Sequence, residues 1–164
     1  MKNNILILLF TVLISVGISG CTEWLNLRPE GEMVLDDYWQ TESEAEAVMT
    51  ACYRALIEND CTQRMLIWGE LRSDDVTEGL SMTDVISKIL RQEIEPTNVF
   101  SSWSSFYSVI NYCNTFLKYA PTVIGKDENF TLDKLHAMEA EVYTIRALAY
   151  FYLVRAFENV PWIS

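Results

Sequence analysis

The longest segment with a helical pattern, residues 132–158, most constrains how this chain can fold. Apolar side chains recur in it at intervals of three and four residues and mark one side of an α-helix: Leu135, Met138, Val142, Ile145, Ala149 and Tyr152. In its second half, further residues extend the apolar surface around the helix: Tyr143, Leu148, Tyr150, Phe151, Leu153 and Phe157. A helix that is apolar on every side is a buried helix. We therefore expect the rest of the fold to enclose this segment.

The preceding segments are also helical in pattern, and none alternates apolar and polar residues as a strand does. The sequence predicts helices over residues 42–58, 60–71 and 101–119, and a weaker one near 85–90. Thr41 and Glu44 form a capping-box signature before the first of these. The last two long helices predict an antiparallel hairpin, with small residues among aromatic ones as in tetratricopeptide-like packing. The expected fold is all-α, built from such helical hairpins.

The first 21 residues have the pattern of a lipoprotein signal peptide. Lys2 precedes an uncharged apolar run over residues 5–18, which is shorter than the ~20 residues of a membrane span and suits a signal-peptide core. Ser19 and Gly20 then precede Cys21, and a lipoprotein signal peptidase requires small residues before a cysteine. The alternative is an ordinary secretory signal with an incidental cysteine. We expect removal of residues 1–20 and lipidation of Cys21, which anchors the chain outside the cytoplasm.

The residues after the signal divide into a linker and a helical region. Residues 21–40 contain Pro29 and Gly31 and no sustained period, which predicts an extended tether before a helical region over residues 41–164. The chain has 23 acidic and 12 basic residues, and its net charge is −11 at pH 7. Such an acidic chain is a poor partner for nucleic acid or for anionic lipid headgroups.

The cysteines and the histidine give little support for a metal site. Lipidation of Cys21 leaves three cysteines, so at least one thiol stays free. Cys52 and Cys61 could bridge a helix to the following loop, but Cys52 lies on an apolar helical stripe, and buried free thiols are the favoured interpretation. There is no Cys-x-x-Cys pair, and the single histidine, His136, lies among charged residues in a helical pattern. We expect no structural zinc site and no cofactor.

Five short motifs follow one another along the chain. They are Cys21 with Leu25–Pro29, Ala51–Leu56, Trp68–Val76, Trp103–Leu117, and the run EAEVYTIRALAYFYLVRAFENVPW from Glu139 to Trp162. In this order, behind a lipidated cysteine, they resemble the SusD/RagB family of outer-membrane nutrient-binding lipoproteins from Bacteroidetes. The resemblance implies a SusD-like helical fold and a non-enzymatic protein, anchored by lipid in the outer membrane and exposed at the cell surface. It implies a glycan or peptide ligand, a SusC-like TonB-dependent transporter as partner, and no nucleic acid.

Two features depart from the family pattern. Glu158 and Asn159 stand where the family usually has Gly-Asp. A glycine there would end the long helix with a positive φ, which Glu adopts poorly, so we expect Asn159 to take over that role. The chain also ends at Ser164, whereas family members run to several hundred residues. We therefore expect an N-terminal portion of a larger protein that behaves as an incomplete domain.

The loop after the second predicted helix is the first candidate for a ligand-facing site. Trp68, followed by Arg72, Asp74 and Asp75, places an aromatic ring beside clustered polar groups outside any apolar stripe. Sugars are bound in this manner, by aromatic faces against C–H surfaces and by polar groups on hydroxyls. In the structural alternative, Trp68 packs between helices and Arg72 pairs with one of the two aspartates. These residues predict a binding site, and the structural alternative stays open.

Two other functional classes share parts of this pattern. Glu70, Asp74 and Asp75 could act as the paired carboxylates of a glycoside hydrolase. Adjacent residues such as the two aspartates usually point in different directions, however, and acidic residues in solvated loops are common. A helical-repeat scaffold for protein partners would have the same fold and differ only in its ligand.

Overall fold

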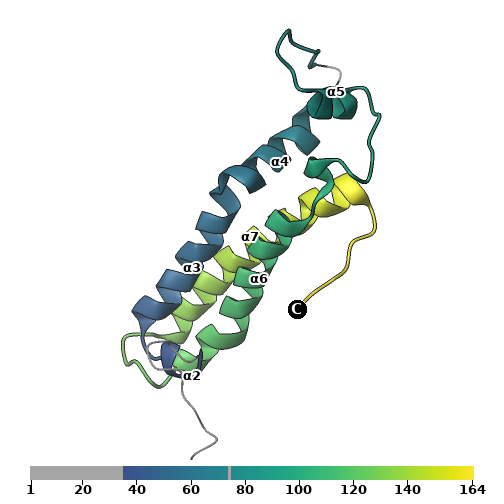
Figure 1. The fold of residues 1–164 in the computed structure, drawn as a ribbon. Coiled ribbons are helices and arrows are strands. Elements are labelled where there is room, and N and C mark those ends of the chain that lie inside the picture. The colour runs from purple at the N-terminus through teal and green to yellow at the C-terminus, as the bar shows by residue number, and fades with distance from the viewer. Residues whose placement is uncertain (1–34, 74) are drawn as a thin grey trace, which may run out of the picture. The chain divides into compact units, whose positions relative to one another are not determined.

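The computed structural model describes residues 35–73 and 75–164. In these residues the chain forms helices and short 3-10 turns, with a single isolated bridge between Ile124 and Asp127 and no β-strand (Figure 1). The elements are α2 (Leu35–Tyr38), α3 (Glu42–Ile57), α4 (Asn59–Glu70), α5 (Asp84–Leu90), η2 (Val99–Ser101), α6 (Ser104–Tyr119), η3 (Ala120–Val123) and α7 (Leu132–Phe157). The predicted all-α class is confirmed. The predicted signal peptide and Cys21 lie outside the described residues.

Residues 38–164 form one compact unit, and the helices named below belong to it. Within this unit α6 and α7 form the predicted antiparallel hairpin, and α3 packs against both of them (Figure 1). The helix that follows α3, α4, continues beyond it along the chain, and α5 lies near the far end of α4 (Figure 1). The predicted bounds of the long helices differ from the observed ones by a few residues at most, as expected of helix ends.

Side-chain caps lie at the starts of two helices, α3, where a cap was predicted, and α7, where none was. At α3, one carboxylate oxygen of Glu44 accepts hydrogen bonds from the backbone N–H groups of Gln40 and Thr41, each at 2.7 Å. These bonds, the one from Gln40 first, hold the pKa of Glu44 below its ordinary value. At α7, the Thr131 hydroxyl accepts a hydrogen bond from the Lys134 N–H at 3.4 Å. Otherwise unpaired N–H groups at the helix starts are thereby satisfied.

The end of α7 differs from the expectation at one residue. Glu158 itself adopts a φ of +62°, and its N–H donates to the Val154 carbonyl at 2.9 Å. Asn159 is not among the residues with positive φ. The prediction that Asn159 takes over the family glycine's role is therefore wrong. The turn requires the positive φ at the first residue after the helix, whatever the side chain there.

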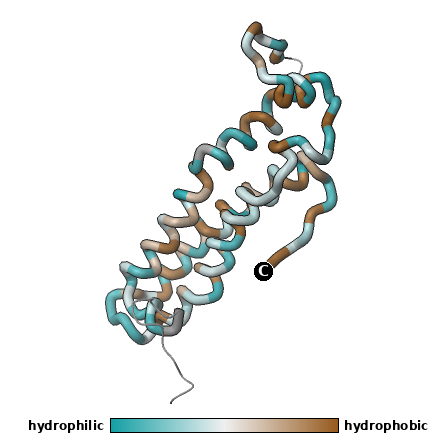
Figure 2. Tube along the Cα trace, viewed as in Figure 1, coloured by the Kyte–Doolittle hydropathy of each residue, from teal (hydrophilic) through white to brown (hydrophobic). Residues whose placement is uncertain are grey.

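Most of the buried residues form one cluster, which we call the main core. It contains 20 buried residues, drawn chiefly from α3, α6 and α7, with Phe106, Phe116 and Leu153 among its largest fully buried side chains. Hydrophobic positions recur along each of these helices (Figure 2). A smaller cluster of Ile67, Trp68 and Ile89, which we call the distal core, lies where α4 and α5 meet. The hydrophobic effect therefore acts mainly through the three-helix contact.

The α7 helix is buried on one side only, in contrast to the expectation. The predicted stripe is inside, with Leu135, Val142 and Ala149 at most 4% exposed. On its other side the described residues leave four large side chains exposed by 38–56%: Tyr143, Leu148, Phe151 and Val154. We call these four residues the outer face of α7. The helices that pack against α7, chiefly α3 and α6, contact it from one side, so apolar composition all around a helix does not by itself enclose it.

The end of the predicted tether is also packed. Residues 35–38 are helical, and Trp39 is 2% exposed in the main core. Its ring stacks on Tyr119 with centroids 5.8 Å apart, and its carbonyl oxygen accepts a hydrogen bond from Lys126 Nζ at 2.8 Å. The prediction of an extended tether is therefore wrong for residues 35–40, because burial of a large aromatic side chain outweighs the absence of a helical period.

Three further expectations concern single side chains and the membrane. Cys52, Cys61 and Cys113 are free and buried, as favoured. His136 is exposed on α7. Among the helices of residues 35–73 and 75–164, none combines the length and the apolar character of a membrane span.

Candidate functional site

The predicted ligand loop begins at the end of α4, where Trp68 is a packing residue. Its side chain is 5% exposed, and its indole Nε1 donates a hydrogen bond to the Phe100 carbonyl oxygen at 2.9 Å. Its ring meets that of Phe157 edge-on, with centroids 5.3 Å apart. The ring thus joins α4 to η2 and to the end of α7. It does not present a face to a sugar, and the packing alternative for Trp68 holds.

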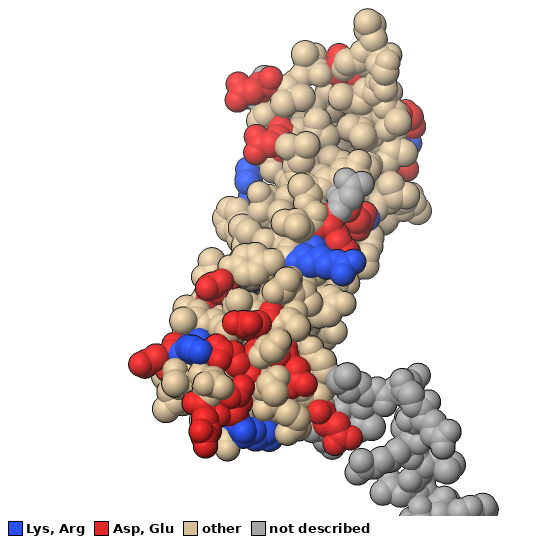
Figure 3. Space-filling view, turned by 90° about the vertical axis from the view of Figure 1, so that its left-hand side faces the viewer, with Lys and Arg blue, Asp and Glu red and all other residues tan. Residues whose placement is uncertain are grey.

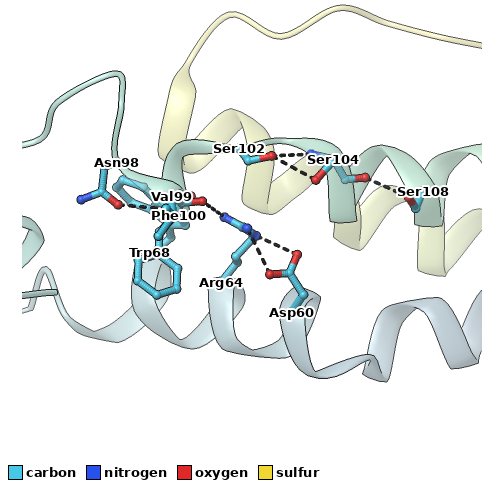
Figure 4. Close-up of polar contacts among 9 residues, drawn as sticks. All are labelled: Asp60, Arg64, Trp68, Asn98, Val99, Phe100, Ser102, Ser104 and Ser108. Atoms are coloured by element: carbon cyan, nitrogen blue, oxygen red, sulfur yellow. Dashed lines mark hydrogen bonds and ion pairs between the residues drawn. The ribbon is translucent and has the colours of Figure 1, made fainter. Parts of the chain in front are cut away.

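A second polar contact fixes the same segment one turn earlier on α4. Arg64 is 7% exposed and donates a hydrogen bond to the Val99 carbonyl oxygen at 2.7 Å (Figure 4). Its guanidinium also donates two hydrogen bonds of 3.0 Å to the carboxylate of Asp60. The Asn98 side chain accepts from the Phe100 N–H at 3.0 Å (Figure 4). The chain returning from α5 is therefore attached to α4 by directional bonds to charged and amide groups.

An ion pair joins the loop between α4 and α5 to Arg91, the residue that follows α5. Arg91 Nη2 contacts both carboxylate oxygens of Glu78, at 2.8 and 2.9 Å. Hydrogen bonds from Ser87 and Arg91 hold the pKa of Glu78 below its ordinary value. Both partners of the ion pair are solvent-accessible, so its contribution to stability is small. The ion pair restrains the position of Glu78 without burying its side chain.

A small pocket lies between this loop and the end of α7. Its volume is about 230 Å³, and its lining residues are Trp68, Gly69, Arg72, Ser73, Gln92 and Arg155. Arg155 Nη2 donates to the Gly69 carbonyl oxygen at 3.3 Å. Gln92, just after α5, has a φ of +62°. The pocket therefore gathers two guanidinium groups and an amide, which donate hydrogen bonds in fixed planes.

This pocket brings together two of the four predicted site residues, Trp68 and Arg72. Arg72 is exposed and lines the pocket, whereas Asp75 is exposed and does not. Asp74 lies outside the described residues. In residues 35–73 and 75–164 no ion pair joins Arg72 to Asp75, so that version of the local-pair alternative is absent there. Sequence reasoning missed Gln92, which carries no motif signal, and Arg155, which lies in the Leu-Val-Arg part of the closing motif.

A second polar pocket lies along α6 and α7. It has a volume of about 570 Å³ and is lined by Asn111, Asn114, Thr115, Leu117, Lys118, Tyr119, Tyr143, Arg146, Ile163 and Ser164. Arg146 Nη1 donates to Asn114 Oδ1 at 2.7 Å, and its guanidinium lies over the rings of Tyr143 and Trp162, at 5.0 and 5.4 Å. The Asn114 amide in turn donates to the Ile163 carbonyl oxygen at 3.0 Å. These contacts hold the last residues against α6 and α7.

An apolar groove lies between α4, the loop that follows it and α5. It has a volume of about 640 Å³ and is lined by residues of α4, of the loop and of α5, among them Leu66, Leu71, Val76, Met82 and Ile86. Glu70, the first of the carboxylates considered for hydrolysis, lies on its wall. No group of three His, Cys, Asp or Glu side chains within the described part of the chain could hold a metal ion.

Charge is unevenly distributed over the surface. Figure 3 shows acidic side chains gathered at the end of the unit where α3 and α7 begin, with Glu42, Glu44 and Asp133 in the first turns of those helices. Carboxylates are favourable at helix N-termini, so these residues have a structural explanation. The pocket with Arg72 and Arg155 lies at the other end of α7.

Known proteins resemble this chain over nearly its whole length. The family model described as starch-binding and associating with the outer membrane, of the SusD-like class, matches residues 23–164. A SusD-like protein of Formosa agariphila is 27% identical over 93% of this chain and 29% of its own length. A second one from that organism is 25% identical over 99% and 31%, and a SusD-like protein of Bacteroides ovatus is 27% identical over 100% and 29%.

The match covers only part of each curated relative. The chain spans about three tenths of the length of these curated relatives. No solved structure is significantly similar to it. The family model, by contrast, covers all the described helices, from the short α2 to the end of α7, and the segment after them. The chain therefore belongs to the SusD-like family of starch-binding proteins associated with the outer membrane.

Proposed function

We propose that this chain is part of a lipid-anchored protein that binds nutrient glycans, or oligopeptides, at the cell surface and delivers them to a SusC-like TonB-dependent transporter. The observation that carries the proposal is the family match over residues 23–164. The lipid anchor is proposed at Cys21, directly behind the apolar run and two small residues.

Binding without catalysis suits the groups that the pockets offer. The pocket at the end of α4 has guanidinium and amide donors from Arg72, Gln92 and Arg155. Such groups bind hydroxyl and carbonyl oxygens by hydrogen bonds and need no proton transfer. We therefore assign Arg72 and Gln92 as the ligand contacts of this pocket, and we retain Asp74 and Asp75 as sequence-based candidates.

Calorimetry with the full chain tests the ligand contacts. The ligands are a maltooligosaccharide, oligosaccharides of other linkages and a mixed oligopeptide pool. Arg72→Ala and Gln92→Ala should each weaken binding about fivefold, which corresponds to a lost hydrogen bond of about 1 kcal/mol. Arg54→Ala, an exposed arginine on α3, is the matched control. Thermal melts must be unchanged in all three variants.

Two outcomes would count against this assignment. Unchanged affinity in both Arg72→Ala and Gln92→Ala would move the binding site away from this pocket. Absence of binding to every glycan and peptide tested would contradict the nutrient-binding function itself.

Fractionation of cells tests the anchor. The wild-type chain should be found in the outer-membrane fraction and gain the mass of its acyl groups, whereas Cys21→Ala should be released or retain its leader. Normal processing and membrane association of Cys21→Ala would show that Cys21 is not the anchor. The transporter partnership is tested by mild crosslinking on intact cells, which should recover a TonB-dependent outer-membrane transporter with the chain.

One observation favours a second function, a helical scaffold for protein partners. The outer face of α7 leaves four large apolar side chains exposed, and apolar patches on a surface often mark protein contacts. Phe151→Gln distinguishes the two functions. A variant that loses a protein partner and keeps glycan affinity would support the scaffold alone.

A further inference from the structure

Two arginines in the pocket at the end of α4 have no carboxylate partner. Arg72 and Arg155 both line this pocket, and neither forms an ion pair with an acidic side chain in the part of the chain that the structure describes. Other basic side chains on and just after α4 and α5 differ, because Arg64, Lys88 and Arg91 each pair with an Asp or Glu. The pocket therefore has two positive charges that no described carboxylate neutralises.

The hydrogen-bond donors of this pocket are largely unused. Arg155 is held in place, since its Nη2 donates to the Gly69 carbonyl oxygen at 3.3 Å and its guanidinium lies 6.0 Å from the centre of the Phe151 ring. The remaining N–H groups of that guanidinium stay available in one plane. Within the described residues, the side chains of Arg72 and Gln92 make no hydrogen bond. A ligand in the pocket thus meets several free donors.

Acceptors and aromatic faces are scarce in the same pocket. No Asp or Glu of the described chain lines it. The Ser73 hydroxyl already donates to the Glu70 carbonyl oxygen at 2.7 Å, and the 5% exposed Trp68 ring packs edge-on against Phe157. A neutral sugar hydroxyl donates as well as accepts hydrogen bonds, and the C–H surface of a sugar packs on aromatic faces. A group that only accepts hydrogen bonds fits this lining better.

We propose that this pocket binds the carboxylate of a uronate residue in an acidic oligosaccharide, between Arg72 and Arg155. The inference rests on the proposed function, since the match to a family described as starch-binding supports a glycan as the ligand. A carboxylate accepts two parallel hydrogen bonds from one guanidinium, and such charge-assisted bonds are stronger than bonds between neutral groups. The volume of about 230 Å³ is below the roughly 300–1,000 Å³ of pockets that enclose a drug-sized ligand, so the pocket suits one charged residue of a longer chain.

The charge of the whole chain makes the two arginines necessary for such a ligand. The net charge is −11, so an anionic oligosaccharide is repelled at long range. The acidic side chains that gather where α3 and α7 begin lie at the opposite end of α7 from this pocket (Figure 3). Attraction of a carboxylate therefore depends on short-range contacts with Arg72 and Arg155.

Calorimetry with the full chain and matched pairs of ligands tests the preference for charge. Oligogalacturonate, oligomannuronate and glucuronate-bearing xylo-oligosaccharides are each compared with the same oligosaccharide after methyl esterification of its carboxylates. A sulfated galacto-oligosaccharide is compared with its desulfated form. At least one uronate should bind about tenfold more tightly than its ester, as expected when a hydrogen bond gains a charged partner. Added salt should reduce that ratio, because it screens exposed charges.

Two variants locate the charge that the uronate contacts. Arg72→Gln and Arg155→Gln each remove one positive charge and should each lower the preference for the acidic form to about threefold or less. Arg54→Gln, which changes an exposed arginine on α3, is the matched control and should keep the full preference. Arg155→Gln also loses the bond to Gly69, whereas Arg72→Gln breaks no hydrogen bond or ion pair in the described chain. Arg72→Gln therefore decides the test if Arg155→Gln lowers the melting temperature.

The outcomes separate this inference from the proposed function. Equal or tighter binding of the esterified oligosaccharides by the wild type would overturn the inference and leave glycan binding intact. A preference kept by both Arg72→Gln and Arg155→Gln would overturn it as well, and a preference for the sulfated ligand alone would overturn the carboxylate assignment. Binding of oligopeptides in place of every oligosaccharide, or no binding at all, would contradict glycan binding itself and the inference with it.

Discussion

The main core and the distal core are stabilised by different interactions. The main core holds 20 buried residues, chiefly from long helices that pack along one another, whereas the distal core holds three, Ile67, Trp68 and Ile89. Around the distal core, hydrogen bonds from Arg64 and Trp68 to backbone carbonyls attach the chain between α5 and α6. A region with few buried apolar contacts opens at lower free energy than the rest of a fold. We therefore expect the distal core and the loop beside it to open at lower free energy than the main core.

The largest expected effect is a loss of packing in the main core. Phe116→Ala removes a ring that is 0% exposed and should lower the free energy of unfolding by about 3–5 kcal/mol. Phe151→Ala, on the outer face of α7, is the matched control and should change it by less than about 0.5 kcal/mol. Urea denaturation followed by circular dichroism measures both. Equal effects would mean that the outer face of α7 is as well packed as the main core.

A local effect is expected in the distal core. Trp68→Ala removes the ring that packs on Phe157 and the hydrogen bond to the Phe100 carbonyl. Because the two cores share few buried residues, residues 84–101 should lose protection from hydrogen exchange while α6 keeps its own. Trp68→Phe, which retains an aromatic ring, should lose less. Equal loss of protection along α6 would show that the two cores unfold as one.

The end of α7 offers a stabilising substitution of smaller size. Glu158 has a φ of +62° and a ψ of −80°, a sparsely populated conformation that costs an L-residue about 1–3 kcal/mol. Glu158→Gly should raise the free energy of unfolding by about 1 kcal/mol, reduced somewhat by the greater freedom of glycine in the unfolded chain. Asn159 does not have a positive φ, so Asn159→Gly should not raise the free energy of unfolding. A gain from Asn159→Gly and none from Glu158→Gly would contradict the observed turn.

The smallest effect expected is the pH dependence of the α3 cap. The pKa of Glu44 is lower in the folded chain, so its charge stabilises the fold above the unfolded pKa. That contribution is lost as pH falls through the folded pKa. Wild type should therefore exceed Glu44→Gln in melting temperature at neutral pH, and the difference should shrink in acid. Glu46→Gln, an exposed residue on the same helix, provides the control, and a difference that persists at low pH would exclude the charge as its cause.

The candidate site was only partly predictable. Arg72 was found because polar residues outside an apolar stripe are visible in sequence. Trp68 belongs to the same motif, but its ring is buried. Its indole N–H donates to the carbonyl oxygen of Phe100, 32 residues away, and a local sequence pattern does not contain that contact. Gln92 reaches the pocket from the turn after α5 and Arg155 reaches it from α7, and sequence spacing does not bring these two segments together.

Local patterns by themselves determined the long helices of this protein, the buried stripe of α7 and the start of α3. Each of these depends on the helical repeat or on side chains within four residues, so a short window of sequence contains the cause. The tertiary structure decided which side of α7 stays exposed, the burial of Trp39 and the composition of the pocket. These features depend on which helix faces which, and that is set by the summed burial of many distant side chains.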